Sequence, residues 1–375
     1  MTLKNILSRY RLNFGGKTLK RKILVIESDD WGTIRMPSKK TYDTLAQQGI
    51  RVDKCPFCRF DSLATPDDLA ALFEVLTKHK DKNGKSAILT ANTIVANPDF
   101  TKIAADKFKT YHFENFTETL QNTPGRSGSF TLWQEGIRAG IFKPQFHGRE
   151  HLQYHRWLEN LRGKSPQTLL AFEQRVFGLS TNVVDEKRRS YMAALDCDNA
   201  AQAAENKRTL AEGIDIFQDI FQTTPTSFIA PNYVWSNTLE ETLAQKGITH
   251  LQSSAYQILP ISEQTESRKT IRRKNGETNS NGQNYTMRNV NFEPASAARD
   301  ILQDSLQQVN IAFRMRQPAV INAHRLNFIG AIIPENRTKN LQTLDKFLGA
   351  ILKKHPQTEF MSSDELSQVY KNKNA

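Results

Sequence analysis

The sequence predicts an α/β protein built around a mainly parallel sheet. Short apolar runs rich in Val, Ile and Leu alternate with longer segments that repeat apolar residues at helical spacing. Parallel strands need a crossover between them, usually a helix, so this alternation is typical of βα units. The chain has 375 residues, of which 38% are hydrophobic and 24% charged, and this suits one large α/β domain or two modest ones.

Six runs are expected to form strands. Each is short, apolar and β-branched, and each is separated from the next by polar or helical sequence. They span 22–27, 86–91, 226–230, 247–252, 319–323 and 359–362. Residues 143–146 form a further strand-like lead.

Three helices are expected between these runs. Thr65 and Pro66 are typical of an N-cap and a first helical residue, and they predict a helix over 66–80. Further helices are expected over 237–246, which Gly247 ends, and over 340–353.

The charge balance bears on partners. The chain has 51 Lys and Arg against 39 Asp and Glu, a net charge of +12, which favours polyanions or an anionic membrane surface as neighbours. The basic residues are scattered and no nucleic-acid-binding pattern is found, so we expect no nucleic-acid partner. An amphipathic N-terminal arm is expected either to rest on an anionic membrane or to pack on its own domain. Its residues are Leu3, Ile6, Leu7 and Tyr10, with Lys4, Arg9 and Arg11.

Cysteine usage and the N-terminus predict a cytoplasmic location, with or without contact to the inner face of the membrane. Three cysteines suit a reducing compartment better than a disulfide framework. No apolar run is long enough to cross a bilayer, and the N-terminus lacks the apolar core of a signal peptide. Cys55 and Cys58 are expected to be free thiols, because the further ligands of a structural zinc site are missing.

Asp29 and Asp30 come at the end of the apolar run 22–27, after Ser28. Catalytic groups are commonly held at the C-terminal ends of strands in barrels and open sheets. Adjacent side chains on an extended backbone point opposite ways, so one carboxylate can bind a metal while the other takes a proton. The alternative is a turn or helix N-cap, with residues 31–33 as the turn.

His147 and His151 are expected to share one side of a helix or helical turn and to bind one ion together. With one Asp they make three ligands, which leaves the open coordination position of a catalytic metal site. Zinc suits this ligand set best, and cobalt, nickel or iron also fit. His155 is not an expected ligand, because it lies a further ~6 Å along the helix axis.

His324 ends the apolar run 319–323. A histidine at this place can donate a proton to a leaving group from the side opposite the base. The alternative is a buried structural histidine that is hydrogen-bonded to the backbone.

Taken in their order along the chain, these motifs resemble those of the metal-dependent polysaccharide deacetylase superfamily, the carbohydrate esterases of the chitooligosaccharide deacetylase type. That family has a strand ending in Asp-Asp, a His-x-x-x-His pair, an Arg-x-Pro-Tyr/Trp segment and a late Leu-x-His. The corresponding segments here are 28–30, 147–151, 230–233 and 322–324. The resemblance implies a distorted (β/α) barrel of about seven parallel strands with a helical insertion.

The resemblance also assigns roles. It makes Asp29 the catalytic base, His324 the general acid, and Asp30, His147 and His151 the metal ligands. A divalent cation would lower the pKa of its bound water from about 15.7 towards ~7, Asp29 would accept the remaining proton, and His324 would protonate the departing amine or alkoxide. The sugar contacts are expected from Trp31, Pro231, Asn232, Tyr233 and Arg325.

The chain departs from the family pattern. Ala230 stands where the family has Arg, so the group that orients the base must come from elsewhere, with Arg149 or Arg325 as candidates on charge. Gly148 replaces the usual Ser or Thr after the first His. The fourth motif, of the Asp-Trp type, has no clear counterpart, although residues 291–294 fall in its place.

We expect residues 1–375 to form one elaborated catalytic domain of this type. Insertions are expected over 53–135 and, mostly helical, over 156–222. The polar segment 262–288 is expected to be a loop.

The expected function is removal of acetyl groups from an N- or O-acetylated sugar or polysaccharide by a metal-dependent hydrolase. Two alternatives stay open. One is a related barrel hydrolase in which paired carboxylates cleave a glycosidic bond. The other is a catalytically inactive glycan-binding module that retains the metal, which the missing Arg and the missing fourth motif motivate.

Overall fold

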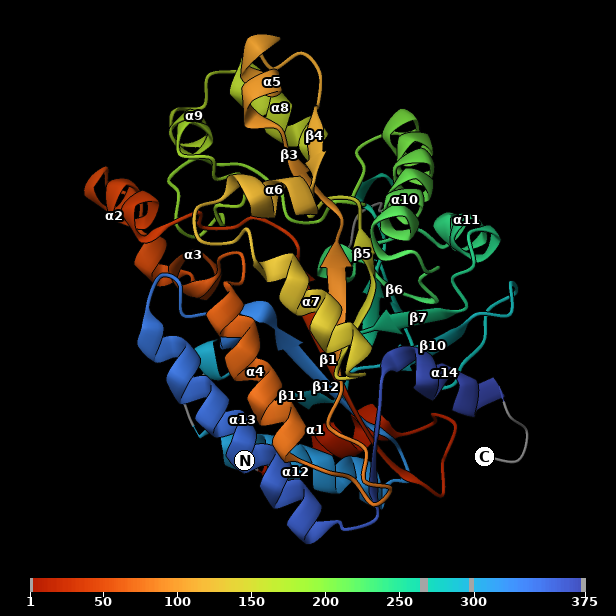
Figure 1. The fold of residues 1–375 in the computed structure, drawn as a ribbon. Coiled ribbons are helices and arrows are strands. Elements are labelled where there is room, and N and C mark those ends of the chain that lie inside the picture. The colour runs from red at the N-terminus through yellow and green to blue at the C-terminus, as the bar shows by residue number, and fades with distance from the viewer. Residues whose placement is uncertain (1–2, 264–268, 297–299, 372–375) are drawn as a thin grey trace.

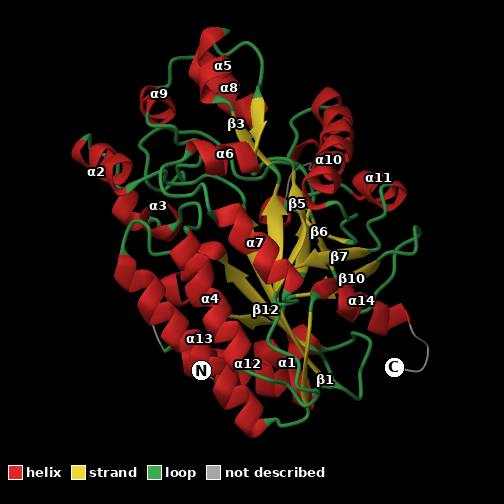
Figure 2. Ribbon diagram, in the orientation of Figure 1, coloured by secondary structure: helices red, strands yellow, loops and turns green. Residues whose placement is uncertain are grey.

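A parallel sheet curved into a half-barrel forms the centre of the fold (Figures 1 and 2). The computed structural model describes residues 3–263, 269–296 and 300–371. Eight strands run in the order β10-β7-β6-β5-β2-β1-β12-β11, a ninth, β13, pairs with β1, and every pairing is parallel. The strands are β1 Lys22–Trp31, β2 Leu89–Ile94, β5 Phe142–Gly148, β6 Ser227–Ile229, β7 His250–Ser253, β10 Asn284–Met287, β11 Val290–Asn291, β12 Ala319–His324 and β13 Thr358–Met361.

β1 organises this sheet. One of its edges pairs with β12 in register, and its other edge is shared between β13 and β2. The two end strands of the order, β10 and β11, are joined by residues 288 and 289 alone, so the chain itself connects the two sides of the half-barrel.

The predicted α/β class and barrel-like sheet are confirmed, and so are the six predicted strands, within a few residues at each end. The strand count is nine and not about seven. Part of the difference comes from the segment 262–288, which is not simply a loop as expected: it contains β9 (Thr270–Arg272) and β10, while residues 264–268 lie outside the described part of the chain. β10 was missed because its sequence, Asn-Tyr-Thr-Met, is too polar to read as a buried strand, yet all four residues are buried.

Helices cover the sheet, with α4, α7, α12 and α13 on one flank and α10 and α11 beside β6 and β7 (Figure 1). Thr65 caps α4 as predicted, since its hydroxyl accepts from the Asp68 N–H while the Asp68 carboxylate accepts from the Thr65 N–H. The helices are α1 Leu3–Asn13, α2 Lys39–Gln47, α3 Pro56–Phe60, α4 Pro66–Lys78, α5 Phe100–Ala105, α6 Phe116–Asn122, α7 Ser129–Arg138, α8 Tyr154–Arg162, α9 Pro166–Glu173, α10 Ala200–Phe221, α11 Glu240–Gln245, α12 Ile301–Arg314, α13 Pro334–Lys354 and α14 Ser363–Lys371.

The two spans expected as insertions differ in character. The span 53–135 contains β2, which pairs with both β1 and β5, so part of it belongs to the central sheet. It also carries the small antiparallel pair β3 (Ala96–Pro98) and β4 (Phe113–Asn115). The span 156–222 holds most of α8 together with α9 and α10, and residues 174–199 between them form neither helix nor strand.

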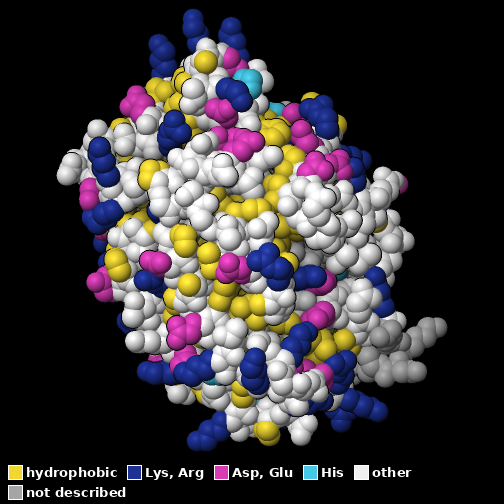
Figure 3. All heavy atoms as spheres, viewed as in Figure 1, with side chains coloured by type: hydrophobic (Ala, Val, Ile, Leu, Met, Phe, Trp, Pro, Cys, Tyr) yellow, Lys and Arg dark blue, Asp and Glu magenta, His cyan; other side chains and the backbone are white. Residues whose placement is uncertain are grey.

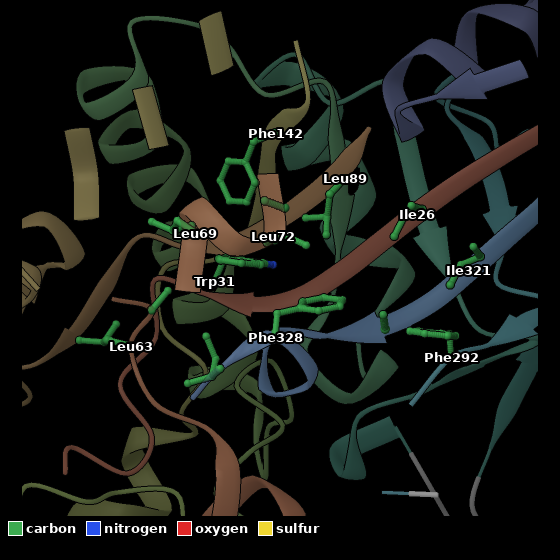
Figure 4. Packing of buried hydrophobic residues seen from close by; sticks show 14 of the residues in the cluster. Ile26, Trp31, Leu63, Leu69, Leu72, Leu89, Phe142, Phe292, Ile321 and Phe328 are labelled. Atoms are coloured by element: carbon green, nitrogen blue, oxygen red, sulfur yellow. The ribbon is translucent and has the colours of Figure 1, made fainter. Parts of the chain in front are cut away.

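The main core lies between β1, β2, β5, β12 and the helices α4, α7 and α13 (Figure 4). Trp31 is 1% exposed and contacts Phe142 and Trp133 edge to face, with ring centroids 4.9 Å and 5.9 Å away. Burying large apolar side chains stabilises a fold by roughly 1.5–3 kcal/mol each. This cluster therefore anchors the end of β1, where the candidate site begins.

The N-terminal arm packs on its own domain. The Tyr10 hydroxyl accepts from Arg314 at the end of α12, and Asn289 donates to the Asn13 side chain. Leu7 and Phe14 remain 61% and 69% exposed. Basic side chains are spread over the visible face and interspersed with acidic ones (Figure 3). In the described part of the chain, no helix has both the length and the apolar character needed to cross a bilayer.

Candidate active site

The C-terminal ends of β1, β5 and β12 bring the predicted site residues together. Asp29 in β1 is the register partner of His324 in β12, and β5 carries His147. Parallel strands end at the same edge of a sheet, which is where α/β proteins bind ligands. These ends open into a cavity of about 410 Å³, within the usual range for small-molecule sites. The cavity is lined by Asp29, Asp30, Arg35, Phe57, His147, His151, Ser180, Thr181, Ser190, Met192, Ala230, Asn232, Tyr233 and His324.

Asp29 and Asp30 both face this cavity although they are adjacent in sequence. The expectation that they point opposite ways is wrong, because the strand is irregular here. Asp30 has a left-handed φ of 70°, and the register between β1 and β2 shifts between Ser28 and Trp31. Bulges of this kind re-aim side chains beside active sites, and a left-handed non-glycine residue costs on the order of 1–3 kcal/mol. The surrounding contacts therefore hold Asp30 in an unfavourable conformation.

Asp30, His147 and His151 form a buried cluster whose potential ligand atoms all lie within 4.8 Å of one another. Asp30 Oδ1 is 3.3 Å from His151 Nε2 and 3.7 Å from His147 Nε2. Among the described residues, Asp30 Oδ1 and His147 Nε2 are buried without a hydrogen-bond partner. Because buried polar atoms are almost always paired, these two orphaned atoms fit the donor set of a divalent cation.

The two histidines are prepared as ligands by their surroundings. His147 Nδ1 lies 2.9 Å from the carbonyl oxygen of Ile229, and a hydrogen bond from Nδ1–H to this acceptor fixes the ring with Nε2 in the cluster. Burial lowers the pKa of His151 to about 4, which keeps its imidazole neutral. A neutral imidazole is the form that binds a metal.

Neither the helix nor the helical turn expected to carry both histidines is present. His147 is the penultimate residue of β5 and His151 lies in the bend before α8, with Gly148 (φ 128°) turning the chain between them. The i, i+4 spacing therefore reflects a strand end followed by a turn. His155 lies in α8 with Nε2 3.2 Å from Glu205, and it does not belong to the cluster, as expected.

Asp29 is held by Arg288, which follows β10. Arg288 Nη2 donates to Asp29 Oδ1 at 2.6 Å and Nη1 donates to Oδ2 at 2.7 Å, while Asn92 donates to Oδ1 at 2.8 Å. Burial would raise the pKa of Asp29, but the charge and hydrogen bonds of Arg288 outweigh it and lower the pKa below its usual value. Asp29 is therefore an ionised carboxylate in a fixed orientation.

Neither arginine expected to orient Asp29 contacts it. Arg149 pairs with Glu150 and Glu212, and Arg325 donates to Asp61 Oδ1 at 2.9 Å. The expectation is wrong because the residue that does so follows a strand that was not recognised in the sequence.

His324 is paired with a carboxylate on its far side. Its Nδ1 lies 2.5 Å from Glu293 Oε1, and Asn327 donates to the other oxygen of Glu293 at 2.7 Å. Burial would lower the pKa of His324, but the negative charges of Glu293, Asp30 and Asp29 raise it to about 9. Nε2 lies 3.8 Å from Asp29 Oδ2, so a protonated nitrogen sits beside the ionised aspartate. Glu293 falls within residues 291–294, the segment that stands in the place of the fourth motif.

Of the five residues expected to contact a sugar, Asn232 and Tyr233 line the cavity. Trp31, Pro231 and Arg325 are not part of its lining. The bulge turns Trp31 into the core, Pro231 is buried at the start of a short 3₁₀ turn, and Arg325 is 0% exposed in its pair with Asp61.

Comparisons with known proteins give distant structural likeness. No protein-family model matches the sequence, and neither does any curated protein. A putative glycoside hydrolase/deacetylase from Parabacteroides distasonis aligns at 9% identity over 94% of this chain and 72% of its own, with a TM-score of 0.47. A putative polysaccharide deacetylase from Mycobacterium smegmatis aligns at 10% identity over 96% and 94%, with a TM-score of 0.44. A probable polysaccharide deacetylase from Pseudomonas aeruginosa PAO1 aligns at 9% identity over 93% and 90%, also with a TM-score of 0.44.

Proposed function

We propose that this protein is a metal-dependent hydrolase that removes acetyl groups from an N- or O-acetylated sugar or polysaccharide. One observation carries the proposal: a cluster with orphaned metal-ligand atoms shares a cavity with an ionised Asp29 and with His324, whose pKa is raised to about 9. The order of the sequence motifs, which resembles the polysaccharide deacetylase superfamily, supports the same reading.

The ligand cluster fits a divalent cation. Asp30, His147 and His151 would hold it, with zinc as the best match to two imidazoles and one carboxylate and with cobalt, nickel or iron also suited. When bound, such a cation polarises a carbonyl group and makes water a nucleophile at neutral pH.

Asp29 and His324 supply the proton transfers. The Asp29 carboxylate is ionised and oriented by Arg288, so it can accept the proton that the attacking water loses. His324 carries a proton at neutral pH and can give it to the departing amine or alkoxide, after which acetate is released. Glu293 stabilises the imidazolium and fixes the ring.

The same geometry weighs against the two alternatives. A glycosidase needs one protonated carboxyl as its acid, but the pKa values of Asp29 and Asp30 are both lowered, and the proton is carried by His324. The inactive glycan-binding reading was motivated by a missing arginine and a missing acidic motif. Arg288 pairs with Asp29 from another position in the chain, and Glu293, within residues 291–294, pairs with His324.

Acetate release tests the proposal. We expect protein loaded with zinc or cobalt to release acetate from N-acetylated or O-acetylated sugars, and Asp29→Asn and His324→Ala to lower this rate by at least ~10²-fold, the contribution typical of one acid or base. His155→Ala removes an imidazole outside the cluster and should retain the wild-type rate. Release of reducing ends without acetate would favour the glycosidase, and glycan binding without any turnover would favour the binding module.

We also propose that the protein works in the cytoplasm at the inner face of the membrane. The exposed Leu7 and Phe14 and the surplus of basic residues support this location. Co-sedimentation with vesicles that contain anionic lipid tests it. Leu7→Ser together with Phe14→Ser should abolish co-sedimentation, and failure of the wild-type protein to sediment with the vesicles would refute the proposal.

A further inference from the structure

We propose that Arg35 makes the cavity selective for acetylated sugars that bear an anionic group, either a carboxylate or a phosphate. This inference rests on the proposed deacetylase function, because it names the class of substrate for the same cavity.

The guanidinium of Arg35 is a buried charge without a carboxylate partner. Arg35 is 6% exposed and lines the cavity, and no ion pair joins it to any residue in the described ranges. Its Nη1 donates to the sulfur of Met192, a weak acceptor, at 2.8 Å. The other five buried arginines of the described chain each pair with a carboxylate; they are Arg149, Arg156, Arg273, Arg288 and Arg325. A buried charge is normally paired, so Arg35 is left with donors for a ligand.

The packing around Arg35 places its charge close to the reacting groups. Its guanidinium lies over the Phe57 ring, 5.3 Å from the ring centroid, and the same ring contacts His324 edge to face at 5.1 Å. Gly178 leaves room for it, since a Cβ there would lie 2.6 Å from Nη1. An anionic group bound to Arg35 would thus belong to the same small ligand as the acetyl group.

The neighbouring carboxylates are already engaged. Asp29 is paired with Arg288, Asp30 lies between two imidazoles, and Asp61 is paired with Arg325. Among the described residues, the group left to neutralise Arg35 is the thiol of Cys55, whose pKa is lowered by hydrogen bonds from Cys58 and Ser180 and by Arg35 itself. A thiolate at Cys55 is the alternative that the experiment must separate from anion binding.

The side chains that line the cavity near Arg35 suit an oxyanion. A guanidinium presents paired N–H donors that match the oxygens of a carboxylate or phosphate. Hydroxyl groups of Ser180, Thr181 and Ser190 line the same cavity and can add hydrogen bonds. The net charge of +12 would also draw an anionic sugar towards the protein.

Binding of three acetylated monosaccharides to the full chain tests the inference by calorimetry. The probes are N-acetylglucosamine, which is neutral, N-acetylmuramic acid, which carries a carboxylate, and N-acetylglucosamine 1-phosphate. We expect wild-type protein to bind at least one anionic probe ~10-fold or more tighter than the neutral one, the effect of one charge-assisted pair. The two anionic probes distinguish a carboxylate from a phosphate as the natural group.

Variants assign the preference to Arg35. Arg35→Gln should lose the preference while binding the neutral sugar as wild type does, which also shows that it is folded, and Arg35→Lys should keep part of it. Arg59→Gln removes the same charge from an exposed position on α3 and should change nothing. Equal binding of all probes by wild type, or a preference that survives in Arg35→Gln, would overturn the inference, and the first result would favour Cys55 as the counter-ion.

Acetate release separates this inference from the proposed function. If acetate is released from the sugars without any preference for the anionic ones, the deacetylase function stands and the anion site fails. If the anionic probes bind through Arg35 and no acetate is released from any sugar, the anion site stands and the deacetylase function fails.

Discussion

Arg288 and Asp29 lie 259 positions apart in the chain and meet in a buried, two-pronged ion pair at the end of β1. The meeting follows from topology, because Arg288 occupies the two-residue junction between β10 and β11 and β11 pairs with β12, the neighbour of β1. Arg288 Nε also donates to Glu27, so one guanidinium serves two carboxylates of the same strand. Arg288 is the strongest of the charges that keep Asp29 ionised, and together with Asn92 it fixes the direction of the carboxylate.

Replacing Arg288 by Gln should damage both stability and activity. Removing one partner of a buried ion pair leaves the other charge buried and unpaired, which lowers the free energy of unfolding by about 3–5 kcal/mol. The pKa of Asp29 would rise because the strongest of the charges that oppose the effect of burial is then gone, and acetate release should fall by roughly 10²-fold or more. Urea denaturation and steady-state rates check the two effects.

Arg288→Lys is the matched variant, since it keeps the positive charge but lacks the paired N–H donors of the guanidinium. It should retain more stability than the Gln variant but little activity, because a lysine cannot orient both oxygens of Asp29. Wild-type rates in Arg288→Gln would show that Asp29 does not need this partner.

The pairing of His324 with Glu293 should set the alkaline limit of activity. The pKa of His324 is raised to about 9, above the ordinary value of 6.5, so the acid is protonated at neutral pH and is lost as the pH rises through about 9. In Glu293→Gln the strongest of the charges that raise this pKa is gone, and the alkaline limb should move down by roughly 1–3 pH units.

The profile of kcat against pH measures this limb. Glu335→Gln removes an exposed carboxylate and should leave the limb in place. An unchanged limb in Glu293→Gln would mean that another group supplies the proton.

Metal content should depend on the three clustered residues and on no other histidine nearby. After dialysis against zinc, wild-type protein is expected to retain about one ion per chain, and Asp30→Asn, His147→Ala and His151→Ala should each retain almost none. Binding to the folded state alone stabilises it, by about 2.7 kcal/mol at a free-ion concentration of 100 times Kd, so zinc should raise Tm in wild type.

His155→Ala is the control, because this imidazole contacts Glu205 outside the cluster. It should keep both the bound ion and the shift in Tm. Full zinc retention in His147→Ala would place the ion elsewhere.

The sheet could be predicted where strands are apolar and buried, as in residues 22–27 and 319–323. β10 was not predicted because its polar residues are buried against distant segments: the Asn284 amide donates to Ser367 in α14, and the Tyr285 hydroxyl donates to Glu240 in α11. Hydrophobic periodicity cannot show hydrogen bonds between distant segments. β10, the strand that leads to Arg288, could therefore not be predicted from the sequence, and neither could the contact of Arg288 with Asp29.

In the candidate site too, features that are local in the sequence could be predicted, and features that depend on packing could not. Asp30, His147, His151 and His324 were found because their spacing and their places at strand ends are local features of the sequence. The left-handed turn at Asp30 was not found, because packing against β2 imposes it on a residue type that does not require it. Arg35 gives no local signal, since its significance lies in the absence of a carboxylate partner within the described structure.

Gly32, two residues after Asp30, should tolerate no side chain. Its φ is 83°, and a Cβ there would lie 2.2 Å from the carbonyl oxygen of Ile94 at the end of β2. Gly32→Ala should therefore combine the cost of a left-handed alanine, about 1–2 kcal/mol, with a further ~1–3 kcal/mol for forcing the backbone of β2 away. Gly49→Ala is the matched control, because Gly49 has a φ of 87° with nothing within 4 Å of the added Cβ, and it should show the conformational cost alone. Equal losses in the two variants, measured by urea denaturation, would mean that the end of β1 is free to move away from β2. A larger loss in Gly32→Ala, together with reduced acetate release, would show that this close approach of two strands holds the Asp30 bulge in place.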